Sequence, residues 1–256
     1  MEVPMKVPLE VIDLAVKIPT PDGVSGGFLY HPAGNGSWPG VIHLTDIVGI
    51  RPASSEMAKR LAAAGYCVLQ PNVFFRTGQP PLIDFPIKLG EDRTMNRFRE
   101  LSRPLPPEAM ERDASAYVDF LASRPSTKKG PMGVVGYCFT GSMALRTAAA
   151  RPDKIGAVAS FHGGGLYTDA PTSPHTVLPR VRARLYFAHA FEDRTMPAEA
   201  IAKLDRALQS WGGAYASEIY PGAKHGWTVP DSAAYNEPQA ERAFEKLIEL
   251  FQSSLE

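Results

Sequence analysis

A cysteine lies at the centre of the stretch VVGYCFTGSMAL, residues 134–145. β-Branched residues lead into Gly136, and apolar residues at helical spacing follow Gly141, so we expect a strand that turns tightly into a helix at Cys138. A residue on such a turn points its side chain out above the sheet. The positive end of the helix dipole there favours thiolate. Cys138 is therefore a candidate nucleophile, and a buried structural cysteine is the alternative that this stretch alone leaves open.

The other cysteine offers a contrast. Cys67 lies inside GYCVLQP, residues 65–71, a short apolar run that is typical of a buried strand. Neither a turn nor a pair of glycines flanks it. We interpret Cys67 as part of the hydrophobic core.

A candidate acid and a candidate base follow later strands. Asp193 lies in the loop FEDRTMP after one apolar run, and His225 lies in PGAKHGW after the last one. Nucleophile, acid and histidine thus follow the chain order of the α/β-hydrolase triad. Glu192 is the alternative acid, but the helix start expected at Met196-Pro197 favours Asp193.

The remaining histidines compete less well for the role of base. Two of them, His43 and His189, fall inside expected strands and are better explained as core or supporting groups. A third, His162, lies at a strand end and could line the pocket. Only His225 follows the final expected strand; the other two histidines are His31 and His175.

Backbone N–H groups near Cys138 could stabilise an oxyanion. The sequence HGGG at residues 162–165 matches a lipase oxyanion motif, but that motif precedes the nucleophile, whereas this one follows Cys138. We therefore interpret it as a glycine-rich turn near the pocket. The early-strand position is occupied by residues 45–49, which makes the N–H groups of Ile47 and Phe139 the candidate donors.

The candidate catalytic residues all follow expected strands, so the strand ends of one sheet must bring them together. Strands that alternate with helices indicate parallel pairs with right-handed crossovers, hence a three-layer α/β sandwich with a mostly parallel central sheet flanked by helices. An opening hairpin adds an antiparallel edge. Ligands bind beyond the carboxyl ends of such strands. The expected strands are 11–19, 26–32, 40–45, 65–71, 133–135, 155–163, 183–190 and 215–221, and the expected helices 54–64, 108–123, 142–150, 197–211 and 238–253.

We expect one α/β domain over residues 1–256. Residues 72–107 are rich in proline and charge and show no clear periodicity, and a segment of this length suggests a functional loop or a small lid. A second proline-rich loop is expected at residues 170–180.

Composition narrows the class of protein. The 27 basic and 27 acidic residues give a formal net charge of zero, which offers no footprint for nucleic acid or an anionic membrane. No apolar run approaches membrane-spanning length. Two cysteines are no disulfide framework, and the N-terminus lacks the apolar core of a signal peptide, so a cytoplasmic protein is expected. No HExxH, paired CxxC, GxGxxG or P-loop is present, so we expect neither a metal nor an organic cofactor.

The motifs GYCFTG, FEDRTMP and KHGW, in this order, resemble the dienelactone hydrolase family of α/β-hydrolases. The resemblance extends over nearly the whole chain, and the cysteine at the turn is its most specific part, because most α/β-hydrolases use serine. It implies a triad of Cys138, Asp193 and His225. It also implies an acidic residue that interacts with the nucleophile, here Asp46 where the family more often has glutamate, and an arginine that holds the substrate carboxylate, here Arg76.

The chain departs from the family pattern at two of its positions. Thr140 occupies a place usually held by glycine, which tightens the turn. Val229 stands where a second carboxylate-binding arginine is expected. These departures argue against dienelactone itself as the physiological substrate. Ester or lactone hydrolysis stays the expected reaction.

Three functions remain open at this stage. The first is hydrolysis of small lactones or enol esters through a cysteine acyl-enzyme. The second is a broader carboxylesterase or thioesterase that uses the same Cys-His-Asp triad. The third is a non-catalytic binding or signalling protein that retains the fold. The expected partner is a small-molecule ester or lactone, and the protein is expected to be a monomer or a small homo-oligomer.

Overall fold

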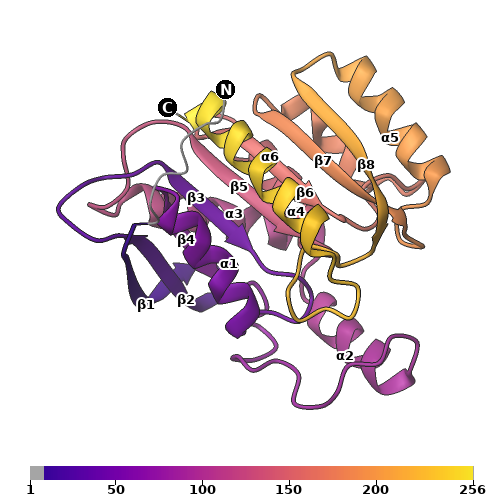
Figure 1. The fold of residues 1–256 in the computed structure, drawn as a ribbon, viewed down its shortest axis with the longest axis horizontal. Coiled ribbons are helices and arrows are strands. Elements are labelled where there is room, and N and C mark those ends of the chain that lie inside the picture. The colour runs from indigo at the N-terminus through magenta and orange to yellow at the C-terminus, as the bar shows by residue number, and fades with distance from the viewer. Residues whose placement is uncertain (1–8, 256) are drawn as a thin grey trace.

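The computed structural model describes residues 9–255 and places one eight-stranded sheet in that part of the chain. The strand order is β1-β2-β4-β3-β5-β6-β7-β8 (Figure 1). β2 pairs antiparallel with β1 and β4, and all other pairs are parallel. The strands are β1 (Val11–Thr20), β2 (Gly23–Pro32), β3 (Gly40–Leu44), β4 (Cys67–Pro71), β5 (Met132–Tyr137), β6 (Ile155–Phe161), β7 (Arg184–Glu192) and β8 (Tyr215–Lys224).

Helices cover both faces of the sheet. α1 and α6 pack on one face, and α3, α4 and α5 contribute to the core of the other. Figure 1 shows α1 and α6 lying across the near side of the strands. The helices are α1 (Pro52–Ala63), α2 (Asp92–Ser102), α3 (Pro107–Ala122), α4 (Thr140–Ala150), α5 (Ala198–Trp211) and α6 (Glu237–Leu255), with a 3₁₀ helix η1 (Pro174–Arg180).

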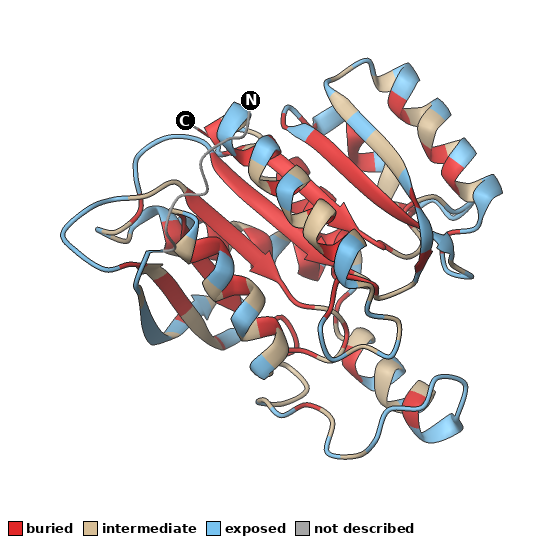
Figure 2. Ribbon diagram, viewed as in Figure 1, coloured by how far each residue is buried: buried red, intermediate tan, exposed pale blue. Residues whose placement is uncertain are grey.

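The central strands form the buried layer. β3, β4 and β5 are buried at every position, as Figure 2 shows for the middle of the sheet. Parallel strands covered on both faces need such continuous apolar runs, whereas the edge strand β1 is mostly exposed. The hydrophobic effect on these two core layers holds the strand ends, and hence the loops that follow them, in place.

The expected three-layer α/β fold is confirmed, with its antiparallel edge hairpin. The structure adds two elements that periodicity did not indicate: α2 within residues 72–107, and η1 within the loop at 170–180. It also starts α4 at Thr140, two residues before the expected Ser142. The nucleophile candidate therefore has only Phe139 between itself and the helix.

Several loops meet beyond one end of the sheet. α2 and the loop between β8 and α6 both lie there, past the carboxyl ends of the central strands (Figure 1). The segment 72–107 contacts the loops that follow β3 and β5. Leu82 lies so close to Gly49 that a Cβ there would come within 2.4 Å of its Cδ1. The rings of Phe74 and Phe139 are 6.1 Å apart.

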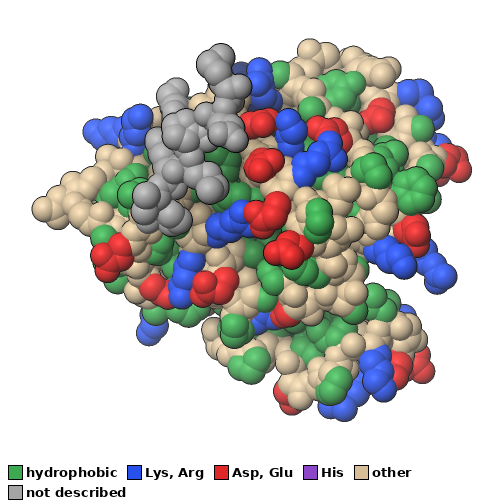
Figure 3. All heavy atoms as spheres, viewed as in Figure 1, with side chains coloured by type: hydrophobic (Ala, Val, Ile, Leu, Met, Phe, Trp, Pro, Cys, Tyr) green, Lys and Arg blue, Asp and Glu red, His purple; other side chains and the backbone are tan. Residues whose placement is uncertain are grey.

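The surface carries mixed charge. On the face shown in Figure 3, acidic and basic side chains are interspersed, and pairs such as Arg60–Glu241 and Arg242–Glu218 link α1, α6 and β8. This matches the formal net charge of zero. None of the helices in residues 9–255 has the length and apolar character that crossing a bilayer would require.

Candidate active site

Cys138 occupies a tight turn directly after β5. Its φ of 55° is in the left-handed region, which costs a non-glycine residue energy and is typical of a nucleophile elbow. Flanking glycines permit the turn. A Cβ on Gly136 would approach the carbonyl oxygen of Thr140 to 2.3 Å, and one on Gly141 would lie 2.4 Å from Ser160 Oγ. The strain, held by a buried strand and helix, leaves the Cys138 side chain half-buried at the end of the sheet.

Thr140 reinforces this turn from inside. Its buried hydroxyl accepts the N–H of Tyr137 at 3.0 Å and lies 3.1 Å from the carbonyl oxygens of Leu44 and Tyr137. The threonine, noted in the sequence as a departure, thus links the elbow to the end of β3. Its side chain fixes the turn and does not occupy the space above Cys138.

Asp193 and His225 form an acid–base pair in which the carboxylate is buried. Nδ1 of His225 donates to Oδ2 of Asp193 over 2.7 Å, and the Asp193 side chain is 1% exposed. Thr195 holds the other carboxylate oxygen, through its N–H at 2.8 Å and its hydroxyl at 2.6 Å. A carboxylate anchored at three points keeps the imidazole in one orientation, with Nε2 directed away from Asp193.

The electrostatics of His225 connect it to Cys138. Burial alone would lower the pKa of His225, but hydrogen bonds and charge interactions with Asp193 and Cys138 outweigh burial and raise it to about 10. Burial likewise works to raise the pKa of Asp193, but the hydrogen bond from His225 and those from Thr195 hold it below its ordinary value. Asp193 is thus the hydrogen-bond partner of His225 at 2.7 Å, and Cys138 contributes to the raised pKa of the same imidazole.

Two candidate backbone donors lie at the same end of the sheet. Within residues 9–255, neither the N–H of Ile47 nor that of Phe139 donates a hydrogen bond to the protein. Both follow the carboxyl ends of neighbouring parallel strands, β3 and β5. Free N–H groups are what an oxyanion requires. The arrangement suits the role expected for them.

Asp46 lies in the loop after β3, but its carboxylate is engaged by a neighbour. Arg51 donates to Oδ1 at 2.7 Å and to Oδ2 at 2.8 Å, and the N–H of Val48 donates to Oδ1 at 3.0 Å. Arg51 also forms a two-point pair with Asp231, in the loop after His225. The expected contact between Asp46 and the thiol does not occur among the hydrogen bonds of the described residues. Asp46 instead fixes the loop that carries Ile47.

Arg76 differs more clearly from its expected role. Both of its terminal nitrogens donate to Asp113, at 2.7 and 2.8 Å, and one donates to Asp22 at 2.6 Å. The Asp113 side chain is 0% exposed, and the guanidinium lies over the Phe75 ring. A buried carboxylate needs this partner. The geometry therefore gives Arg76 a structural role, and the substrate-binding role expected from the sequence stays a prediction.

Cys67 is a core residue, as its position suggested. It is fully buried in β4, its sulfur lies 3.3 Å from Ser126 Oγ, and burial raises its pKa. A raised pKa disfavours the reactive thiolate. Of the two cysteines, only Cys138 has the setting of a nucleophile.

His162 has contacts beside the candidate triad that the sequence did not predict, since its position there indicated no more than a pocket-lining residue. The backbone N–H of Cys138 is shared between Nδ1 of His162 and the carbonyl oxygen of Phe161, each at 3.1 Å, and Nε2 of His162 lies 2.8 Å from Thr228 Oγ1. Its ring centroid is 5.1 Å from that of His225. The signal available in the sequence was the position of His162 directly after β6, at the same end of the sheet as Cys138.

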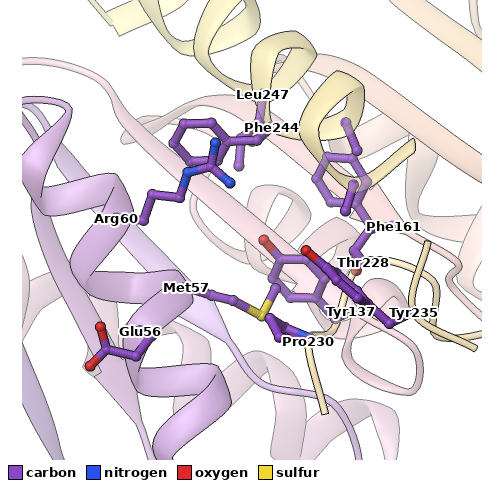
Figure 4. Close-up of a pocket in the computed structure, with 12 residues that line it drawn as sticks. Glu56, Met57, Arg60, Tyr137, Phe161, Thr228, Pro230, Tyr235, Phe244 and Leu247 are labelled. Atoms are coloured by element: carbon purple, nitrogen blue, oxygen red, sulfur yellow. The ribbon is translucent and has the colours of Figure 1, made fainter. Parts of the chain in front are cut away.

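A cavity of about 150 Å³ lies between α1, α6 and the loop after His225. Tyr137, Phe161 and Thr228 form its inner wall, and Met57 and Phe244 lie toward the helices (Figure 4). Neither Cys138 nor His225 lines it. The cavity is therefore a feature next to the candidate active site, on the other side of Thr228.

The sheet order, the elbow after β5 and the acid and histidine after β7 and β8 define an α/β-hydrolase. The model of the dienelactone hydrolase family matches residues 26–255, and the chain belongs to that family. It is accordingly a member of a family of hydrolases.

Individual relatives agree with this assignment. A carboxymethylenebutenolidase of Rhodococcus opacus is 28% identical over 236 residues, covering 89% of this chain and 86% of its own. A candidate carboxymethylenebutenolidase of Synechocystis is 26% identical, covering 94% and 96%. A crystal structure of a candidate dienelactone hydrolase from Klebsiella pneumoniae superposes with a TM-score of 0.84 at 21% identity, covering 95% and 99%, and supports the fold.

Proposed function

We propose that this protein hydrolyses small lactones or enol esters through an acyl-enzyme on Cys138. The observation that carries the proposal is a half-buried thiol on a strained turn, together with a histidine that a buried aspartate orients and whose pKa Cys138 helps to raise. Cysteine nucleophiles are activated by just such a neighbouring base. The family assignment supports ester or lactone hydrolysis, and the geometry supports the cysteine as the attacking group.

The first half of the reaction forms the acyl-enzyme. The Cys138 thiolate attacks the carbonyl carbon, an S–C bond forms, and the carbonyl electrons move to oxygen. The N–H groups of Ile47 and Phe139 stabilise that oxyanion, a contribution of about 3 kcal/mol for each donor in comparable sites. Collapse of the intermediate breaks the C–O bond, and the His225 imidazolium gives its proton to the departing oxygen.

The second half releases the acid. Neutral His225, still held by Asp193, takes a proton from water, and the resulting hydroxide attacks the thioester carbonyl. The S–C bond breaks, the acid leaves, and the thiolate and imidazolium are restored. The raised pKa of His225, about 10, fits a free enzyme that holds this proton at neutral pH. Asp193 stays ionised throughout, because its own pKa lies below the ordinary value.

Competition by hydroxylamine tests the acyl-enzyme. Esters of one acid with different leaving groups should give the same ratio of hydroxamate to free acid, because all pass through one thioester. A ratio that changes with the leaving group would mean that no common intermediate forms. The Cys138→Ala variant, which should give neither product, is the matched control.

A broader carboxylesterase or thioesterase is the second candidate, and one observation favours it. Arg76, the expected anchor for a substrate carboxylate, is bonded to Asp113 and Asp22, and Val229 is 3% exposed where a second arginine was expected. A site without these anchors has less reason to prefer acidic substrates. A panel of acidic lactones, neutral aryl esters and acyl thioesters separates the two: a strong preference for acidic lactones supports the first candidate, and comparable kcat/KM across the panel supports the second.

A further inference from the structure

The glycine-rich turn at residues 162–165 contacts all three loops that carry the triad. The N–H of Gly164 donates to the carbonyl oxygen of Cys138 at 3.3 Å, and the N–H of Gly165 donates to that of Thr195 at 2.8 Å. Thr195 in turn holds Asp193. The turn thus joins the nucleophile loop to the acid loop through its backbone.

His162, the first residue of this turn, makes the third connection with its side chain. Because Nδ1 accepts the N–H of Cys138, the ring proton is on Nε2, and Nε2 donates to Thr228 Oγ1. Thr228 is three residues after His225, in the same loop. The imidazole is 1% exposed, and burial keeps its pKa well below the ordinary value. It is therefore neutral, as this pair of hydrogen bonds requires.

His162 also has a strained backbone conformation. Its φ is 41°, and it and Cys138 are the two non-glycine residues with positive φ in residues 9–255. Its own N–H donates to Ala188 of β7 at 2.8 Å. Strained residues persist where surrounding structure fixes them and cluster at functional sites. A hydrogen bond joins these two residues, the strained non-glycine positions of the described part of the chain.

We propose that His162 is a positioning residue: its imidazole links the backbone of Cys138 to Thr228 and so fixes the separation between the nucleophile and the loop that carries His225. The inference rests on the proposed acyl-transfer function. His162 touches no reacting atom. Its contribution is to hold Cys138 Sγ and the His225 ring at the distance that proton transfer needs.

Thr228→Val removes the hydroxyl and keeps the shape of the side chain. The methyl group that replaces Oγ1 meets Nε2 of His162, which lies 2.8 Å from that oxygen, and the cavity of about 150 Å³ that Thr228 lines gives the side chain room to move away from the ring (Figure 4). We expect kcat to fall about 10- to 100-fold, the scale of a small misplacement in an active site, with KM nearly unchanged. Thr228→Ser, which keeps the hydroxyl, should restore most of kcat.

Thr147→Val is the matched control. Thr147 is as well buried as His162, and its hydroxyl donates to the carbonyl of Met143 within α4. Its loss should lower the unfolding temperature and leave kcat of the folded enzyme as it is. Equal kcat in the Thr228→Val and Thr147→Val variants would overturn the proposal.

A double-mutant cycle tests whether Thr228 acts through His162. His162→Asn tolerates the left-handed backbone, and its amide oxygen can accept the N–H of Cys138, but the shorter side chain does not reach Thr228. In this background Thr228→Val should lower kcat by less than about twofold, because the link is already absent. The same factor in both backgrounds would show that Thr228 acts independently and would overturn the inference.

Alkylation of Cys138 by iodoacetamide, followed by peptide mapping, needs no substrate. At pH 7 we expect the Thr228→Val variant to react more slowly than wild type, since the imidazolium of His225 is less well placed to favour thiolate. If wild type alkylates readily but cleaves none of the esters, the proposed function fails while this comparison still tests His162. Unchanged alkylation in Thr228→Val would overturn the positioning role.

Discussion

Nδ1 of His225 lies 2.7 Å from Oδ2 of Asp193, and the aspartate side chain is 1% exposed. A short charge-assisted hydrogen bond to a buried carboxylate is among the stronger polar interactions in a protein. It connects the loop after β7 to the loop after β8, so the pair both orients the base and joins two ends of the sheet. Its consequences are measurable in stability as well as in rate.

The pair predicts a specific dependence of stability on pH. The pKa of His225 rises from 6.5 to about 10 on folding, so its contribution to stability is complete below about pH 6.5 and is lost as the pH rises toward 10. We expect the difference in free energy of unfolding between wild type and Asp193→Asn to shrink over this window. Urea unfolding at several pH values measures it, in proteins that both keep Cys138, because Cys138 contributes to the raised pKa of His225. A difference that stays constant from pH 6.5 to 10 would contradict the pairing.

The triad should act as one unit. His225→Ala and Cys138→Ala should each remove most of the turnover, and the double variant should be hardly slower than either single variant, because the residues share one step. Steady-state rates of the four proteins with one aryl ester give the result. Losses that multiply would mean that the two residues act independently.

Arg76 should support the fold and not read substrate charge. Arg76→Ala leaves Asp113 buried without its partner, which should lower the free energy of unfolding by about 3 kcal/mol. The effect on kcat/KM should be equal for acidic and neutral substrates. Adding Asp113→Asn removes the unpaired charge and should recover part of the lost stability. A loss confined to acidic substrates would return Arg76 to the substrate-binding role.

Asp46 should act by anchoring its loop. Asp46→Asn weakens the pair with Arg51 and loosens the loop that carries the Ile47 N–H, so we expect kcat to fall by about tenfold, less than the hundredfold or more that follows removal of an oxyanion donor. The rate at which iodoacetamide labels Cys138 should stay nearly the same. Asp231→Asn, which leaves the Asp46–Arg51 pair in place, is the control. Faster labelling with normal kcat would instead indicate that the Asp46 charge tunes the thiol.

The sequence predicted the centre of the sheet because the central strands are buried on both faces and read as continuous apolar runs between glycine and proline. It predicted the positions of Cys138, Asp193 and His225 because each directly follows an expected strand. α2 was missed because its sequence, DRTMNRFRELS, is mostly polar and charged, has only Met95, Phe98 and Leu101 as large apolar residues at helical spacing, and lies within a proline-rich segment. The roles of Arg76 and His162 depended on partners far along the chain, Asp113 and Thr228, which local patterns do not reveal.

The most direct test of the account is the turnover of Cys138→Ala with the ester that wild type cleaves fastest. We predict a rate at least about a thousandfold below that of wild type, on the scale of triad losses in other hydrolases, with an unchanged circular dichroism spectrum and unfolding midpoint close to that of wild type. Cys67→Ala, which alters the buried cysteine, should keep its rate. A Cys138→Ala protein that retains more than about one-twentieth of the wild-type rate would contradict the central claim that Cys138 is the nucleophile.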